Sequence, residues 1–265
     1  MSLVSHLKEA KHKLFPKKEF VIYKGCVLPA KHLRFNGPGF RDNSFYIHTA
    51  RLEAKRLIEK LGCNSKSHIL EIGCGQGRLV TGLLMLIGRL SYVGFDVHLP
   101  SVRWCRKYIE KREPSYHFEH LDIASERYHK GGRQIDHHFK FDIPDRSIDI
   151  IYIWGVFTNL DGEVMKIYLN DLKRMLAPGG RIFFTAFVEE DVPDISINPK
   201  GYLFEEYSSP LQVVRYEKNY LFSLISRAGL VIDDFVYGKE FDGQSEFYLS
   251  QKAPVIGSVV TSAHS

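Results

Sequence analysis

The most constraining feature of this chain is the segment 71–77, which reads Glu-Ile-Gly-Cys-Gly-Gln-Gly and places glycine at Gly73, Gly75 and Gly77. A short apolar segment precedes it, and apolar residues three to four apart follow it from Arg78 onward. This order predicts a strand, a tight turn and a helix. Glycine has no Cβ, so the turn can bend sharply and let a ligand lie against backbone amides near the positive end of the helix. A turn that serves packing alone stays open as an alternative.

Strands and helices alternate along most of the remaining chain. Apolar segments predict seven strands, at 68–72, 91–95, 116–121, 148–154, 181–188, 230–237 and 246–249. Helical periodicity predicts helices between them, at 78–87, 100–112, 162–176 and 219–228. This alternation predicts an α/β fold with a seven-stranded, mostly parallel sheet and helices on both faces. The segment 238–245 is too short for a crossover helix, so we expect an antiparallel last strand.

Three regions are expected along the chain. Residues 1–64 are predicted to form a helical N-terminal lid, residues 65–252 the α/β domain and residues 253–265 a mobile tail. Within the lid we expect an amphipathic helix at Ser2–Phe15, a loop at 30–43, and a helix that begins with Ser44 as N-cap and ends at Leu61 before Gly62. Within the domain, the His-, Gly- and Lys-rich segment 125–141 reads as a surface insertion.

Charged residues near the glycine turn indicate the class of ligand. Glu71 would repel a pyrophosphate but suits a cationic amino acid, and Arg78 stands where the dinucleotide motif G-x-G-x-x-G needs glycine. Asp96 ends the second predicted strand and can bind both hydroxyls of a ribose, with a helix cap as the alternative. Asp122 follows the third strand and can accept from an adenine amine, with a solvated loop acid as the alternative. This combination favours S-adenosylmethionine (SAM) over a nicotinamide dinucleotide.

Five segments resemble motifs of the class I SAM-dependent methyltransferases, namely 71–77, 93–96, 121–123, 141–151 and 172–182. The resemblance covers roughly residues 65–188 and implies SAM as cofactor and S-adenosylhomocysteine as product. It implies that the glycines line the methionine, that an acid binds the ribose and that Trp154 lies near the sulfonium. The full set of cofactor-binding residues predicted in this way is Glu71, Gly73, Cys74, Gly75, Gly77, Asp96, Val97, Asp122, Ile123 and Trp154.

The chain departs from the family's patterns at two places. The insertion 125–141 stands where many members run directly onward. The fourth predicted strand ends in Trp154-Gly155-Val156-Phe157 rather than in an Asn/Asp-Pro-Pro-Tyr motif. Methylation of amino groups in nucleic acids is therefore less expected.

We predict methyl transfer by direct displacement to an oxygen or nitrogen of a small-molecule metabolite. A hydroxyl acceptor needs a general base, and His48 is the predicted one because histidine titrates near neutral pH. The alternative is a histidine on the surface of the lid helix. The segment 28–45 is expected to cover the cofactor, or else to be a packing arm. Other candidate catalytic residues at the acceptor site are Tyr46, Glu189, Glu190, Tyr216 and Glu217. Candidate aromatic walls of the acceptor site are Tyr202, Phe204, Tyr207 and Tyr216, with core or surface packing as the alternative.

Composition and charge limit which classes of binding partner are expected. The formal charge is +5, but lysine and arginine are spread along the chain, so nucleic acid is not the expected acceptor. The four cysteines form no C-x-x-C pair and the histidines match no standard zinc spacing, so no metal is expected. Free thiols, no signal peptide and no apolar run long enough for a bilayer predict a cytoplasmic protein without membrane attachment. A homodimer stays open.

Three rival functions also remain at this point. An RNA methyltransferase would use the same cofactor, and steeply salt-dependent RNA binding would support it. An NAD-dependent oxidoreductase would need glycine in place of Arg78. A non-catalytic SAM-binding protein would have the same cofactor residues.

Overall fold

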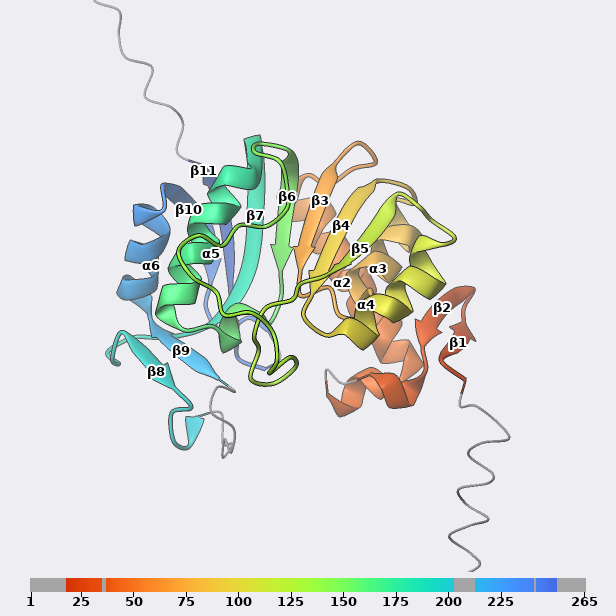
Figure 1. Ribbon diagram of the computed structural model, residues 1–265, viewed down its shortest axis with the longest axis horizontal. Helices are drawn as coiled ribbons and strands as arrows, with labels where there is room; N and C mark the ends of the chain where they lie inside the picture. The colour runs from red at the N-terminus through yellow and green to blue at the C-terminus, as the bar shows by residue number, and fades with distance from the viewer. Residues whose placement is uncertain (1–17, 35–36, 203–212, 241, 252–265) are drawn as a thin grey trace, which may run out of the picture. The chain divides into compact units, whose positions relative to one another are not determined.

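The computed structural model describes residues 18–34, 37–202, 213–240 and 242–251 (Figure 1). The predicted helix Ser2–Phe15 and the predicted tail 253–265 lie outside the described residues. The chain divides into two compact units. The first comprises Met1–Ser67 and Gly73–Asp122, and the second comprises His68–Ile72 and Ile123–Ser265.

The first unit opens with a hairpin that the sequence analysis did not predict. Strands β1 (Phe20–Tyr23) and β2 (Cys26–Pro29) pair antiparallel across a turn at Lys24 and Gly25. Both turn residues have positive φ, at 49° and 79°, as a two-residue hairpin turn requires. The predicted lid therefore begins, in its described part, with strands rather than with a helix.

The segment after the hairpin was predicted to be a loop and contains two 3₁₀ turns, η1 (Lys31–Leu33) and η2 (Pro38–Arg41). Helix α2 (Asn43–Leu61) follows, and its N-cap is Asp42, not the predicted Ser44. The Asp42 carboxylate accepts a hydrogen bond from the Phe45 N–H at 2.8 Å, which satisfies one of the free amides of the first turn. Gly62 ends the helix with φ 72°, as predicted.

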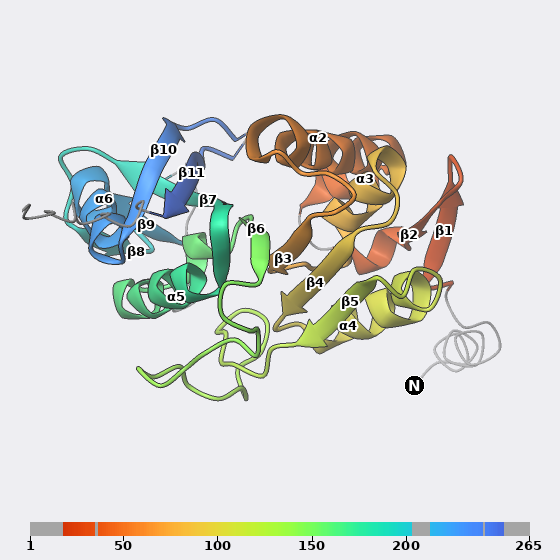
Figure 2. The same cartoon turned by 90° about the horizontal axis from the view of Figure 1, so that it is seen from above.

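The rest of the first unit contains α3 (Arg78–Leu86), β4 (Ser91–Asp96), α4 (Leu99–Cys105) with its π-helical continuation η3 (Arg106–Glu110), and β5 (Tyr116–His120). Strands β4 and β5 lie side by side and pair in parallel (Figure 2). Their register places Asp96 opposite His120. Helix α2 packs on α3, and the two backbones approach closely at Gly82. A Cβ at that position would overlap the Ala50 carbonyl.

The second unit contains the other five predicted strands, β3 (His68–Ile72), β6 (Ile148–Ile153), β7 (Leu176–Glu189), β10 (Leu230–Val236) and β11 (Ser245–Gln251). Strand β6 pairs in parallel with both β3 and β7. Strand β11 is antiparallel to both β7 and β10, which confirms the predicted antiparallel last strand. All seven predicted strands are thus present, and the α/β fold class is confirmed.

Several details of the second unit differ from the prediction. Strand β7 begins at Leu176 rather than at Arg181, and it therefore includes the segment 177–180. Two short strands were not predicted, β8 (Ile195–Ile197) and β9 (Val214–Glu217). Strand β9 pairs in parallel with the last residues of β7 and antiparallel with β8. Helices α5 (Gly162–Met175) and α6 (Lys218–Arg227) match the predicted helices within two residues at each end. The segment 125–141 holds only isolated bridges, as expected for an insertion.

The N-cap of α5 allows a stability prediction. The Asp161 carboxylate accepts hydrogen bonds from the N–H groups of Glu163 and Val164, at 3.0 and 2.9 Å. We expect Asp161→Ala to lower the free energy of unfolding by about 1 kcal/mol, measured by urea denaturation. The control is Glu163→Ala, which removes an exposed carboxylate of the same turn but no cap. An equal loss in both variants would show that the cap contributes nothing beyond charge.

Candidate cofactor-binding site

The glycine turn is fastened to the end of β4. The N–H groups of Gly73 and Cys74 both donate to the Phe95 carbonyl, at 2.8 and 3.0 Å. Gly73, Gly75 and Gly77 have φ of 85°, 51° and 72°, in the left-handed region that glycine enters without strain. The turn leads directly into α3, so the predicted strand, turn and helix are all present.

Two of the glycines are needed for different reasons. A Cβ at Gly77 would lie 2.6 Å from Cδ1 of Ile109 and 3.5 Å from the Cys105 sulfur, so this position is closed by packing against α4 and η3. A Cβ at Gly75 would meet no heavy atom within 4 Å. Gly75 therefore borders open space, and a side chain there would fill a cradle beside the backbone amides.

Asp96 is tied to this turn at the end of β4. One carboxylate oxygen accepts from the Gly75 N–H at 2.7 Å, and the other accepts from the His98 N–H at 2.7 Å. Burial raises the pKa of the Asp96 carboxyl, although both hydrogen bonds act to lower it. Each carboxylate oxygen has a second lone pair. The two acceptor oxygens thus fit a ligand that offers two neighbouring hydroxyls, as a ribose does.

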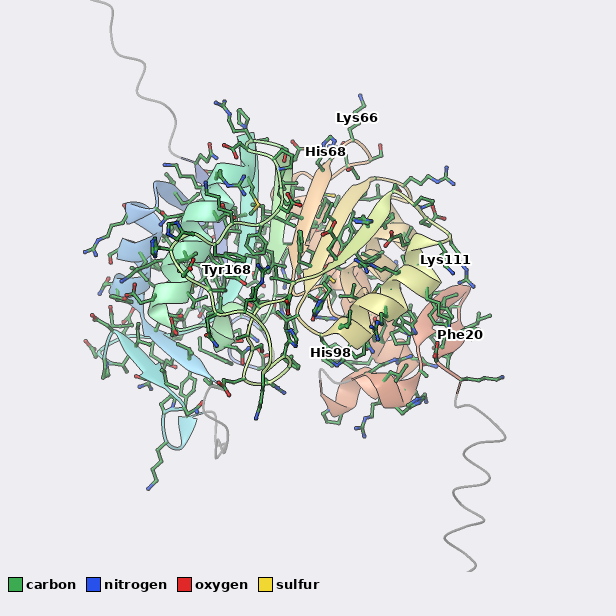
Figure 3. All side chains as sticks on the ribbon, viewed as in Figure 1. Phe20, Lys66, His68, His98, Lys111 and Tyr168 are labelled. Atoms are coloured by element: carbon green, nitrogen blue, oxygen red, sulfur yellow. The ribbon has the colours of Figure 1, made fainter. Side chains whose placement is uncertain are left out.

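The surroundings of Asp96 hold the ends of β4 and β5 in place. The Leu121 N–H donates to the Asp96 carbonyl at 2.9 Å, and the His120 ring lies 3.1 Å from the Val97 carbonyl. His98, which the sequence analysis missed, lies at the start of α4 (Figure 3), and its ring contacts the Ser101 hydroxyl at 2.8 Å. Burial lowers the pKa of His98. Its position two residues after Asp96 was the only signal in the sequence.

The N-terminal arm contacts the glycine turn through Gln76. The Gln76 side chain donates to the Leu33 carbonyl at 2.9 Å, and the Tyr46 hydroxyl lies 3.5 Å from the Gln76 carbonyl. The buried Arg34 guanidinium lies 4.7 Å from the Tyr46 ring and donates to the Pro29 carbonyl at 2.8 Å. Burial raises the pKa of Tyr46, so this phenol stays protonated at neutral pH.

The structure brings six of the ten predicted cofactor residues together within the first unit, namely Gly73, Cys74, Gly75, Gly77, Asp96 and Val97. Asp122 also belongs to this unit and is exposed after β5. The other three belong to the second unit. There Glu71 is buried in β3, Ile123 is buried, and Trp154 is half-buried just after β6.

The predicted base His48 is exposed on α2, whereas Tyr46 of the same helix is buried beside the glycine turn. Two residues along a helix are about 200° apart, so these side chains point in nearly opposite directions. Tyr46 therefore lies on the side of α2 that faces the glycine turn, and His48 does not. The assignment of His48 as base stays a prediction.

Apart from Tyr46, the other candidates for the acceptor site belong to the second unit. The Glu189 carboxylate accepts from the hydroxyls of Tyr237 and Tyr202, at 2.5 and 3.4 Å. The Tyr216 hydroxyl donates to the Leu160 carbonyl, and the Glu217 carboxylate caps α6, so both contribute to the fold. Glu190 pairs with Lys218 at 2.6 Å. Phe204 and Tyr207 lie outside the described residues.

Among the described residues, no group of three or more histidine, cysteine or acidic side chains is placed to hold a metal ion. The four cysteines are free thiols, and Cys63, Cys74 and Cys105 are buried. None of the described helices has the length and apolar character needed to span a bilayer.

Comparison with known proteins points in one direction. A family model described as "Methyltransferase domain" matches residues 70–182, which include the glycine turn and Asp96. The chain is 25% identical over 173 residues to tRNA N(3)-cytidine methyltransferase METTL2 of Danio rerio. This match covers 64% of the chain and 46% of the relative, so the chain spans less than half the length of that relative.

Solved structures show the same fold at low sequence identity. A SAM-dependent methyltransferase from Clostridium acetobutylicum aligns over 78% of this chain and 92% of its own, with TM-score 0.54 and 12% identity. A SAM-dependent methyltransferase from Aquifex aeolicus aligns over 78% of this chain and 97% of its own, with TM-score 0.50 and 18% identity.

Proposed function

We propose that this chain, which belongs to the class I SAM-dependent methyltransferases, transfers a methyl group to an oxygen or nitrogen atom of a small molecule. The family implies SAM as the cofactor. The observation that carries the proposed cofactor site is the link between Gly75 and Asp96, which sets an open glycine turn beside a fixed carboxylate. This arrangement fits a nucleoside, and the carboxylate beside the turn suits a short cationic tail.

We assign the parts of the cofactor to the residues as the motifs suggest. Gly73, Cys74, Gly75 and Gly77 would line the methionine, with Glu71 near its ammonium group. Asp96 and Val97 would hold the ribose through the carboxylate and the neighbouring backbone. Asp122 and Ile123 would flank the adenine, and Trp154 would lie near the sulfur.

The chain's own contribution to the reaction is chiefly alignment. When bound, SAM would supply a methyl group on a positively charged sulfur: a bond from the acceptor lone pair to the methyl carbon would form as the carbon–sulfur bond breaks, with S-adenosylhomocysteine as the leaving group. Holding the two reactants in line can supply about 7–11 kcal/mol of the barrier. A hydroxyl acceptor would also need a base, whereas a neutral amine needs none.

A tRNA is the second candidate acceptor, because the Danio rerio relative carries that activity in its name. A screen with methyl-labelled SAM over phenols, amines, carboxylates, sugars and unmodified tRNA separates the two candidates. Transfer to a small molecule and none to tRNA supports the first proposal. Transfer to tRNA alone, with binding that falls steeply as salt rises, overturns it.

We also propose that the N-terminal arm, residues 1–64, holds the cofactor turn in its binding conformation. Gln76→Ala removes the hydrogen bond to Leu33, and we expect about fivefold weaker SAM binding by calorimetry, equivalent to one hydrogen bond. The matched control is Gln134→Ala, an exposed glutamine of the insertion in the other unit. Unchanged affinity in Gln76→Ala would reject a contribution of this link.

A further inference from the structure

A pocket lies between the hairpin turn and α2, within the first unit. Its volume is about 310 Å³, and it is lined by the hairpin turn at Lys24 and by one stripe of α2 that includes His48, Arg51 and Lys55. His48 lies on the opposite side of the helix from Tyr46, which contacts the glycine turn. The pocket is therefore separate from the proposed cofactor site.

The lining of this pocket carries only positive charge. Lys24, Arg51 and Lys55 are cationic, and no carboxylate of the described residues lines the pocket. Within the part of the chain that the structure describes, none of these three makes an ion pair. The nearest acid of the helix, Glu53, is buried and pairs with Arg78 instead.

Such an arrangement is unfavourable unless an anion offsets it. Arg51 and Lys55 are four residues apart on the helix, a spacing at which like charges repel and a Glu–Lys pair would stabilise. Lys24 adds a third charge from a different element, brought there by the hairpin. An uncompensated concentration of one sign of charge in a concave site attracts ligands of the opposite sign.

The chemistry of the lining indicates the kind of anion. An arginine fork binds phosphate oxygens in pairs, and lysine adds a point charge. The Ser44 hydroxyl at the start of the helix can donate a further hydrogen bond. Ile47 and Leu52 form an apolar part of the wall, against which a carbon framework can pack. The volume is at the lower end of the range for small-molecule sites.

We propose that this pocket binds a phosphate group, carried by a small phosphorylated molecule or by a nucleic-acid backbone. Arg51 and Lys55 hold the phosphate oxygens from the helix, and Lys24 holds them from the hairpin. The site acts beside the proposed methyl transfer and does not depend on it.

The test compares two double variants that lose the same charge. Arg51→Gln with Lys55→Gln empties the helix stripe of its cations. Lys66→Gln with Lys111→Gln removes two exposed lysines of the same unit that extend outward from the ribbon in Figure 3. Calorimetric titrations use inorganic pyrophosphate and, separately, a short single-stranded RNA, and thermal unfolding checks that both variants are folded.

We expect the pocket variant to lose about tenfold or more in affinity and the control to bind as the wild type does. Weaker binding of both probes would indicate a site that accepts phosphate groups from either source. Weaker binding of RNA alone would identify a site for the phosphates of a nucleic acid. Equal losses in the two variants, or no binding of either probe by the wild type, would overturn the proposal. If the double variant does not fold, Lys24→Gln in the hairpin turn tests the same site. Methyl transfer is not measured, so failure here leaves the proposed function standing.

Discussion

Asp96→Ala is expected to weaken SAM binding roughly 100-fold, because it removes the proposed acceptor for two ribose hydroxyls. The same change also leaves the Gly75 N–H without its carboxylate partner, so the glycine turn loses a fixed point. The pKa of Asp96 is raised by burial, which means that holding the charged carboxylate there costs folding free energy at neutral pH. We therefore expect the variant to remain folded while it loses the cofactor.

Calorimetry with SAM and a thermal unfolding curve measure the two effects separately. Glu119→Ala is the matched control, because Glu119 is a carboxylate of the neighbouring strand that pairs with His117 at 3.0 Å. We expect this control to bind SAM as the wild type does. Wild-type affinity in Asp96→Ala would show that the ribose is held elsewhere.

The second large effect is a contrast between Gly77→Ala and Gly75→Ala. Gly77→Ala adds a methyl group 2.6 Å from Ile109, at a residue with φ 72°. We expect it to lower the free energy of unfolding by about 3 kcal/mol, from backbone strain and overpacking together. Gly75→Ala meets no neighbour, so only the strain of its φ of 51° remains, about 1 kcal/mol.

Cofactor binding should rank the same two variants in the reverse order. The methyl group of Gly75→Ala projects into the open space of the cradle, so we expect it to weaken SAM binding with a small loss of stability. For Gly77→Ala, we expect the loss of folding stability to be the larger of its two effects. Urea denaturation measures the stability of both variants, and calorimetry measures their affinity for SAM. Equal stability losses would contradict the packing described for Gly77.

The hairpin shows what the sequence analysis overlooked. Two apolar quartets flank Lys24-Gly25, and a two-residue turn ending in glycine between such segments is a hairpin signal. The N-cap of α2 is different, because both Asp42 and Ser44 are good capping residues. Contacts of the Arg34 guanidinium with the Asp42 carbonyl and the Asn43 side chain stabilise the chain at that point, and these are tertiary contacts. The correct cap could not be chosen from local preference.

The cofactor site divides in the same way. The glycine turn and Asp96 could be predicted, because each depends on residues at the end of a strand and on their spacing. The link from Gln76 to Leu33 could not, since it joins residues 43 positions apart through the folded arm. The proposed phosphate site likewise depends on the hairpin, which brings Lys24 to the same pocket as residues of α2. Residues that meet only through tertiary structure leave no periodic signal in the sequence.

The central claim is that the glycine turn and Asp96 bind a sulfonium nucleoside rather than a dinucleotide. Calorimetric titration of the wild-type chain with SAM, S-adenosylhomocysteine and NAD tests it most directly. We expect saturable binding of both sulfur nucleosides at one site, competition between them and no binding of NAD. Tight binding of NAD, or no binding of SAM by folded protein, would contradict it.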